Sequence, residues 1–261
     1  MSKVAQMEIQ VNDTIDCIIS SYPAAARVLS KHGIDFCSEG HRTLKDACTE
    51  TEVSLKRLLR EITKASAYRE NELSNPSAVS VDELTRYIER YHHQFTAETI
   101  VFIKTSLNRL VRLHGAKYPE LGQIRNLFDE VTGPITVHMQ HEEFIVFPYI
   151  RDLARKGKKI KSPIFRSSNS PIAGLINDHM KGATYLKKLD VLTNHYSPPS
   201  GEGTAFRITY AAMRELEKDI NTHLRLEDEI LFPRAIEMEI RLSHGLSAIR
   251  KDEPMSSTPT N

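Results

Sequence analysis

The chain has few cysteines, no excess charge of either sign and no long apolar run. Its three cysteines, Cys17, Cys37 and Cys48, match no common disulfide or zinc spacing, so a reducing cytoplasm is the expected setting. The 35 basic and 34 acidic residues leave a net charge of +1, which argues against a nucleic-acid surface or a polybasic membrane patch. No stretch approaches the roughly 18 apolar residues that a membrane span needs, and the first residues lack a signal-peptide pattern. We therefore expect a cytoplasmic protein that binds neither nucleic acid nor membrane.

Strand signals are also sparse, because the chain shows no sustained alternation of apolar and polar residues and no Asn-Gly hairpin. Helical periodicity dominates instead, and four long helical patterns joined by loops favour an up-down-up-down four-helix bundle. The predicted fold class is all-α. We predict a small helical domain over residues 1–66, a linker over 67–79, the bundle over 80–242 and a disordered tail over 243–261.

An internal repeat stands out in the bundle. The segments HMQHEEFIVFP and HLRLEDEILFP both contain His-x-x-x-Glu, followed after four residues by Phe-Pro. Side chains four residues apart lie on one face of a helix, so each pair can present a nitrogen and a carboxylate to the same point. The two pairs are His138 with Glu142 and His223 with Glu227.

One further histidine precedes each pair on an earlier helix. His92 lies 46 residues before the first pair and His179 lies 44 residues before the second. His93 is about 100° around the helix from His92, and we expect it on the polar surface. Glu143 and Asp228 occupy matching positions in the repeat and are expected to face solvent. The six predicted metal ligands are His92, His138, Glu142, His179, His223 and Glu227.

This donor set indicates a reactive metal centre. Imidazole and carboxylate groups suit iron, manganese or zinc and are poor ligands for copper(I) or an iron–sulfur cluster. Four histidines and two glutamates fit two metal ions, each with two histidines and both carboxylates as bridges. At least one coordination position then stays open on each ion, as is typical of reactive sites.

The repeat, with YHH around His92 and NDH around His179, resembles the hemerythrin-like domain of the repair-of-iron-centres family. The resemblance implies a centre of two non-haem iron ions, bridged by Glu142 and Glu227 and by an oxo or hydroxo group. Oxygen-carrying hemerythrins have a His-x-x-x-His pair on the third helix, whereas Ala183 stands four residues after His179 here. This difference argues against oxygen carriage.

The N-terminal segment is similar to the short helical domain of the same family. That family usually shows Cys-Cys-Gly-Gly after an Asp-aromatic pair, whereas this chain has Cys37, Ser38, Glu39 and Gly40. A role that needs two adjacent thiols is therefore not expected. Cys37 remains a candidate reactive thiol, with a partly buried and inert cysteine as the alternative.

The resemblance implies repair of iron–sulfur clusters damaged by nitrosative or oxidative stress, with damaged iron–sulfur proteins as partners and iron supply as the mechanism. Three alternatives stay open. A ferrous pair could reduce nitric oxide to nitrous oxide, the bundle could sense oxygen or nitric oxide, or the metal could be a structural zinc. The N-terminal domain is too small for a strong core of its own, so we expect it to pack on the bundle or on a second copy in a homodimer.

Overall fold

A computed structural model describes residues 9–67, 73, 75–156 and 171–243. Helices account for nearly all regular structure in these residues, which contain no strand beyond a single antiparallel bridge between Thr14 and Thr43. None of the described helices is long and apolar enough to span a membrane. The predicted all-α fold class is confirmed. Residues 68–72 and 74 of the predicted linker over 67–79, and all of the predicted tail over 243–261 except its first residue, lie outside the described residues.

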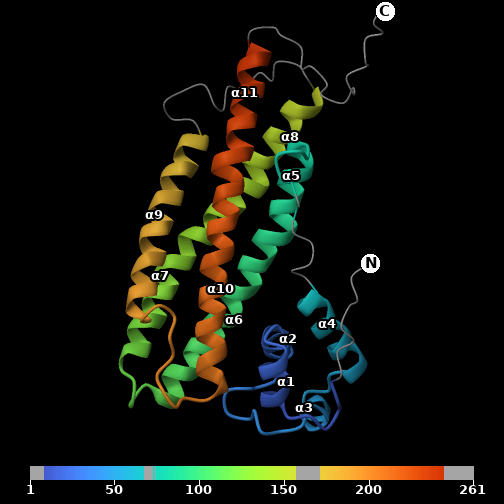
Figure 1. The fold of residues 1–261 in the computed structure, drawn as a ribbon, viewed down its shortest axis with the longest axis vertical. Coiled ribbons are helices and arrows are strands. Elements are labelled where there is room, and N and C mark those ends of the chain that lie inside the picture. The colour runs from blue at the N-terminus through green and yellow to red at the C-terminus, as the bar shows by residue number, and fades with distance from the viewer. Residues whose placement is uncertain (1–8, 68–72, 74, 157–170, 244–261) are drawn as a thin grey trace, which may run out of the picture.

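Four short helices form the N-terminal part of the molecule (Figure 1). Two of them begin at threonine caps, because Thr14 accepts a hydrogen bond from the amide of Cys17 and Thr43 accepts one from the amide of Asp46. The second helix ends at Lys31 and is followed by Gly33, whose φ of +75° is the left-handed conformation that glycine adopts without strain. The helices are α1 (Ile15–Ser21), α2 (Ala25–Lys31), α3 (Leu44–Glu50) and α4 (Leu55–Ala67).

Four long helical rods form the bundle, and three of them contain a π-helical turn. The first rod begins at a capping box, in which Ser80 and Glu83 each accept a hydrogen bond from the other's backbone amide. The rods are α5 (Val81–Tyr87), η2 (Ile88–His93) and α6 (Gln94–His114); α7 (Glu120–His141), η3 (Glu142–Val146) and α8 (Phe147–Lys156); α9 (Pro171–Leu192); and α10 (Thr204–Leu226), η4 (Glu227–Leu231) and α11 (Phe232–Ser243).

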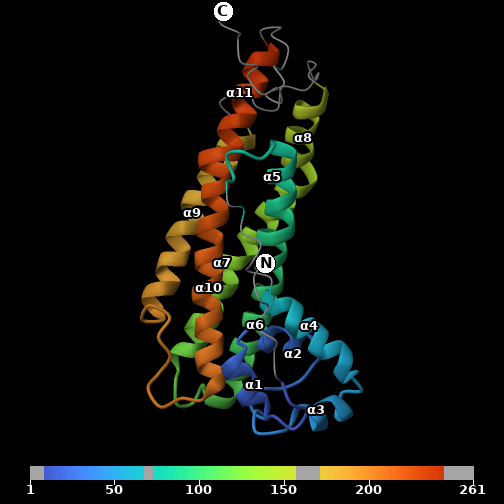
Figure 2. The same cartoon turned by 45° about the vertical axis from the view of Figure 1, so that its right-hand side comes forward.

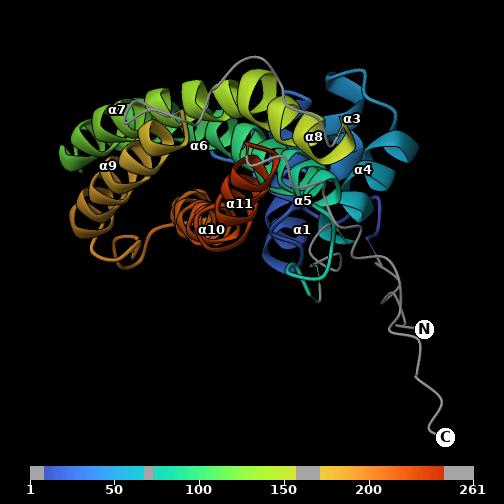
Figure 3. The ribbon, with the colours of Figure 1, turned by 90° about the horizontal axis from the view of Figure 1, so that it is seen from above.

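The rods enclose a common interior. Helix α6 packs against α7 and α10, and α9 packs mainly against α7 and less closely against α10. Viewed along the bundle, α7 and α8 lie in the upper part of the picture, α9 lies at the left, and α10 and α11 lie below α7 and α8 (Figure 3). Figure 2 shows that the rods run side by side along the long axis. The site described below therefore receives side chains from all four rods.

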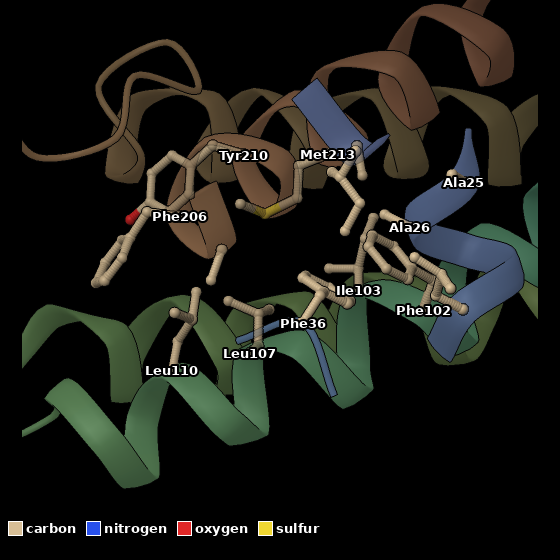
Figure 4. Packing of buried hydrophobic residues seen from close by; sticks show 14 of the residues in the cluster. Ala25, Ala26, Phe36, Phe102, Ile103, Leu107, Leu110, Phe206, Tyr210 and Met213 are labelled. Carbon is tan, nitrogen blue, oxygen red and sulfur yellow. The ribbon is translucent and has the colours of Figure 1, made fainter. Parts of the chain in front are cut away.

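The N-terminal helices share one hydrophobic core with the bundle. They lie beside the end of the bundle that is remote from α8 and α11, against α6 and α10 (Figure 1). Phe36 stacks on Phe102 of α6, with ring centroids 5.7 Å apart, and both rings are almost fully buried. Figure 4 shows Ala25 and Ala26 of α2 in the same cluster as Ile103. The expectation that this segment packs on the bundle agrees with the structure, and the predicted homodimer stays a prediction.

Candidate metal centre

Six side chains converge in the interior of the bundle and form two clusters. The donor atoms within each cluster all lie within 4.8 Å of one another. Because both clusters contain the same two glutamates, the carboxylates stand between two pairs of histidines. The first cluster is His93, Glu142, His223 and Glu227, and the second is His138, Glu142, His179 and Glu227.

The two glutamates are fully buried, and their oxygen atoms lack ordinary partners. Nε2 of His138 lies 3.1 Å from Glu142, and Nε2 of His223 lies 3.0 Å from Glu227. Nevertheless, none of the four carboxylate oxygens accepts a hydrogen bond from any described residue. Such burial of unsatisfied charged groups is costly unless a cation binds them. The carboxylates are therefore arranged for a metal ion.

The histidine nitrogens lead to the same conclusion. Nε2 of His93 lies 3.2 Å from Nε2 of His223, and Nε2 of His179 lies 2.8 Å from Nε2 of His138. Between two facing imidazole nitrogens only one can carry a proton in a hydrogen bond, so at least one lone pair of each pair is directed inward. Two imidazole nitrogens and two carboxylates around one point fit a divalent or trivalent cation.

The pKa values of the clustered side chains are shifted by burial and by neighbouring charges. Burial and the negative charge of Glu142 hold the pKa of Glu227 well above its usual range. Burial also opposes ionisation of Glu142, but its contacts with His138 and His93 outweigh this and lower its pKa. Without a cation, the two buried carboxylates therefore oppose each other's ionisation. The pKa of His223 is lowered well below its usual range by burial and by the charge of His93, which favours the neutral form that binds metals.

The structure corrects the prediction for the first helix. His93 lies in the cluster and is 2% exposed, whereas His92 points to Asp219, with Nδ1 of His92 3.1 Å from the carboxylate. The π-helical turn Ile88–His93 explains the difference. A π-helical turn accommodates one extra residue, so the following side chains rotate back by about 100° relative to an uninterrupted α-helix. His93 thereby takes the direction that regular periodicity assigns to His92.

A small sequence signal favoured His93. In the second half, His179 lies 44 residues before His223. In the first half, His93 lies 45 residues before His138 and His92 lies 46 before it, so the spacing from His93 is the closer match. The other five predicted residues, His138, Glu142, His179, His223 and Glu227, lie in the two clusters.

Two acidic residues contact the cluster, although they were expected only to face solvent. Glu143 accepts a hydrogen bond from Nδ1 of His93 at 2.8 Å, and Asp228 accepts one from Nδ1 of His179 at 2.9 Å. Their side chains are still about one-third exposed, at 36% and 37%. The repeat held the signal for these contacts, because both positions are acidic and each directly follows a buried glutamate.

Among the apolar residues after each His-x-x-x-Glu pair, only some face the site. Phe147 and Phe232 are almost fully buried, and their rings stack on those of His93 and His179. Ile145 is 48% exposed, because the π-helical turn η3 rotates it away from the core.

Cys37 lies far from the clusters. Its thiol is near Arg109 of α6, which is sixteen residues beyond His93 and hence about 24 Å further along the helix axis. Burial, reinforced by the charge of Asp35, raises the pKa of Cys37 to about 11. A thiol with this pKa is protonated at neutral pH, so the structure favours the inert alternative over a reactive thiol.

An all-helical bundle with two histidine–carboxylate clusters around shared glutamates defines a cation-binding protein of the four-helix-bundle class. Comparison with known proteins agrees. The model of the family described as hemerythrin HHE cation binding domain matches residues 84–235. A second model, ScdA_N, a domain of unknown function (DUF542), matches residues 11–66. The chain belongs to the hemerythrin family, and the two matches together with the relatives described next support the repair-of-iron-centres family that its sequence resembles.

Curated relatives match along most of their length. The iron-sulfur cluster repair protein ScdA of Staphylococcus haemolyticus is 26% identical over 215 residues, which cover 82% of this chain and 94% of the relative. The iron-sulfur cluster repair protein YtfE of Edwardsiella ictaluri is 26% identical over 216 residues, covering 83% and 93%. YtfE of Escherichia coli O8 is 25% identical over 218 residues, again covering 83% and 93%.

Proposed function

We propose that this protein repairs iron–sulfur clusters damaged by nitrosative or oxidative stress, and that it does so by supplying iron. The observation that carries the proposal is the pair of buried clusters that share Glu142 and Glu227. The names of the relatives, which are iron-sulfur cluster repair proteins, support it. They favour repair over the nitric oxide reductase and sensor alternatives.

In the proposed centre, His93 and His223 hold one iron ion, and His138 and His179 hold the other. Glu142 and Glu227 bridge the two ions, together with an oxo or hydroxo group. Iron is the cargo, and the surrounding side chains control how tightly it is retained. The carboxylates neutralise much of the positive charge that the iron ions bring into the interior. The neutral histidines bind the ions without adding charge.

The arrangement also supports release. A carboxylate can bind through one oxygen or two, so Glu142 and Glu227 can keep hold of one ion while the other departs. The acceptor that we propose is an iron–sulfur protein whose cluster has lost iron. Binding of nitric oxide or oxygen at the same centre stays a prediction.

Adjacent histidines provide a matched test of the ligand set. The protein is purified anaerobically, loaded with ferrous iron, and its iron is counted for wild type, His93→Ala and His92→Ala. We expect about two ions in wild type and in His92→Ala, and a loss of about one ion in His93→Ala, because only His93 contributes a donor atom to a cluster. Circular dichroism shows whether each variant is folded. Equal iron contents in the two variants would contradict the assignment.

The function is tested with a purified iron–sulfur protein whose cluster has been degraded by nitric oxide, with sulfide and a thiol reductant added equally to every sample. Iron-loaded wild type should restore the cluster absorbance, whereas a Glu142→Ala, Glu227→Ala double variant should not. An equal amount of free ferrous iron with a weak chelator serves as the control for iron that merely leaks into solution. Equal recovery with the double variant and wild type would refute iron donation from this site.

A further inference from the structure

The four histidines of the centre differ at the ring nitrogen that points away from it. Nδ1 of His93 donates to Glu143, and Nδ1 of His179 donates to Asp228. By contrast, Nδ1 of His138 and Nδ1 of His223 are buried and have no hydrogen-bond partner among the described residues. Each cluster therefore contains one held histidine, whose Nδ1 is hydrogen-bonded to a carboxylate, and one histidine whose Nδ1 has no such bond among the described residues.

The two held histidines are fixed in the same way in both halves of the bundle. Besides the carboxylate at Nδ1, each ring has a phenylalanine stacked on its face. Phe147 lies 5.6 Å from His93 at an interplanar angle of 22°, and Phe232 lies 6.1 Å from His179 at 20°. In both halves the phenylalanine follows the acidic residue by four positions across a π-helical turn. A hydrogen bond at the edge and a stacked ring on the face leave the imidazole little freedom to rotate.

A carboxylate at Nδ1 has a defined effect on the other nitrogen. It keeps the proton on Nδ1, so Nε2 presents a lone pair, and it makes that lone pair more basic. Removal of such a carboxylate typically lowers metal affinity about 10- to 100-fold. A histidine without this contact has a buried N–H that lacks a partner, which weakens its preference for one orientation.

We propose that Glu143 and Asp228 are positioning residues that make His93 and His179 the fixed donors of the centre, one for each iron ion. His138 and His223 are then the donors that detach first when iron leaves. This inference rests on the proposed function and deepens it, because it assigns separate roles in retention and release to histidines that look equivalent in the repeat.

The first test is the rate of iron transfer to a strong chelator under anaerobic conditions. Glu143→Ala should speed the release of one of the two ions about tenfold or more and leave the other nearly unchanged, since Glu143 contacts only one cluster. Asp228→Ala should act in the same way on the other ion. The matched control is Glu229→Ala, because Glu229 lies in the same π-helical turn as Asp228 but is 62% exposed and forms an ion pair with Arg225.

Rescue by conservative variants separates a positioning role of the carboxylate from a general destabilisation of the bundle. Glu143→Asp and Asp228→Glu each place in one half the acidic residue that the other half uses, so they should release iron at rates much closer to wild type than the alanine variants. Unchanged rates in the alanine variants, faster loss of both ions in each, or no rescue by the conservative variants would overturn the inference.

A measurement on the unmodified protein does not depend on any variant folding. In protein loaded with zinc as a diamagnetic probe, nuclear magnetic resonance should show protons on Nδ1 of His93 and His179, shifted downfield by strong hydrogen bonds, and smaller shifts for His138 and His223. Unprotonated Nδ1 atoms at His93 and His179 would overturn the inference. If wild type retains iron but repairs no cluster, the proposed function fails while these results still decide the positioning role.

Discussion

Replacing Phe36 by alanine tests whether the N-terminal helices and the bundle are one folding unit. Phe36 is 2% exposed and stacks on Phe102, which is 3% exposed. Truncation of a fully buried phenylalanine typically destabilises a protein by about 3–5 kcal/mol. For a protein of this size, 1 kcal/mol corresponds to a shift in Tm of roughly 2–4 °C. The expected decrease in Tm is therefore roughly 6–20 °C.

The assay is thermal unfolding of the metal-free protein followed by circular dichroism, combined with hydrogen exchange measured on peptides from α2 and α10. Because one core joins both parts, a single transition should move and both sets of peptides should exchange faster. Phe144→Ala is the matched control, since the Phe144 side chain is 76% exposed and its loss should change stability by no more than about 0.5 kcal/mol. Faster exchange confined to α1–α4, with the bundle transition unmoved, would refute a shared core.

Two further predictions concern the centre and the thiols. In the metal-free protein, Glu227→Gln should raise Tm, because it removes a buried carboxyl whose ionisation is opposed by burial and by Glu142. The same change should reduce the increase in Tm on adding ferrous iron. A lower Tm of the metal-free variant would contradict this account. In the native protein at pH 8, iodoacetamide should label the exposed Cys17 well before Cys37, whose pKa is about 11. Mass spectrometry of partly labelled protein measures the order, and faster labelling of Cys37 would restore it as a reactive thiol.

Much of the metal centre could be predicted because its signal is local. A histidine and a glutamate four residues apart share a helix face whatever surrounds them, so His138 with Glu142 and His223 with Glu227 follow from periodicity alone. Their repetition in one chain then predicts two facing halves. The all-α fold follows in the same way, because helix caps such as Ser80 and breaks such as Gly33 are also local.

The tertiary structure decided which of two adjacent histidines faces the interior. His92 and His93 are equivalent in residue type, and a regular helix would favour the wrong one. The π-helical turn at Ile88–His93 sets the rotation. Such a turn gives up regular hydrogen bonds within the helix, so it persists where packing across the bundle compensates for them, and a pattern read along one helix does not contain that information.

The partners of the histidines were likewise decided by contacts between rods. Glu143 and Asp228 lie 50 and 49 residues along the chain from the histidines that they contact, and no periodicity links positions so far apart. By itself, the sequence determined which residue types reach the middle of the bundle. Only the packing of the rods determined which nitrogen each ring presents and which carboxylate holds it there, because these depend on the rotation of each helix about its own axis.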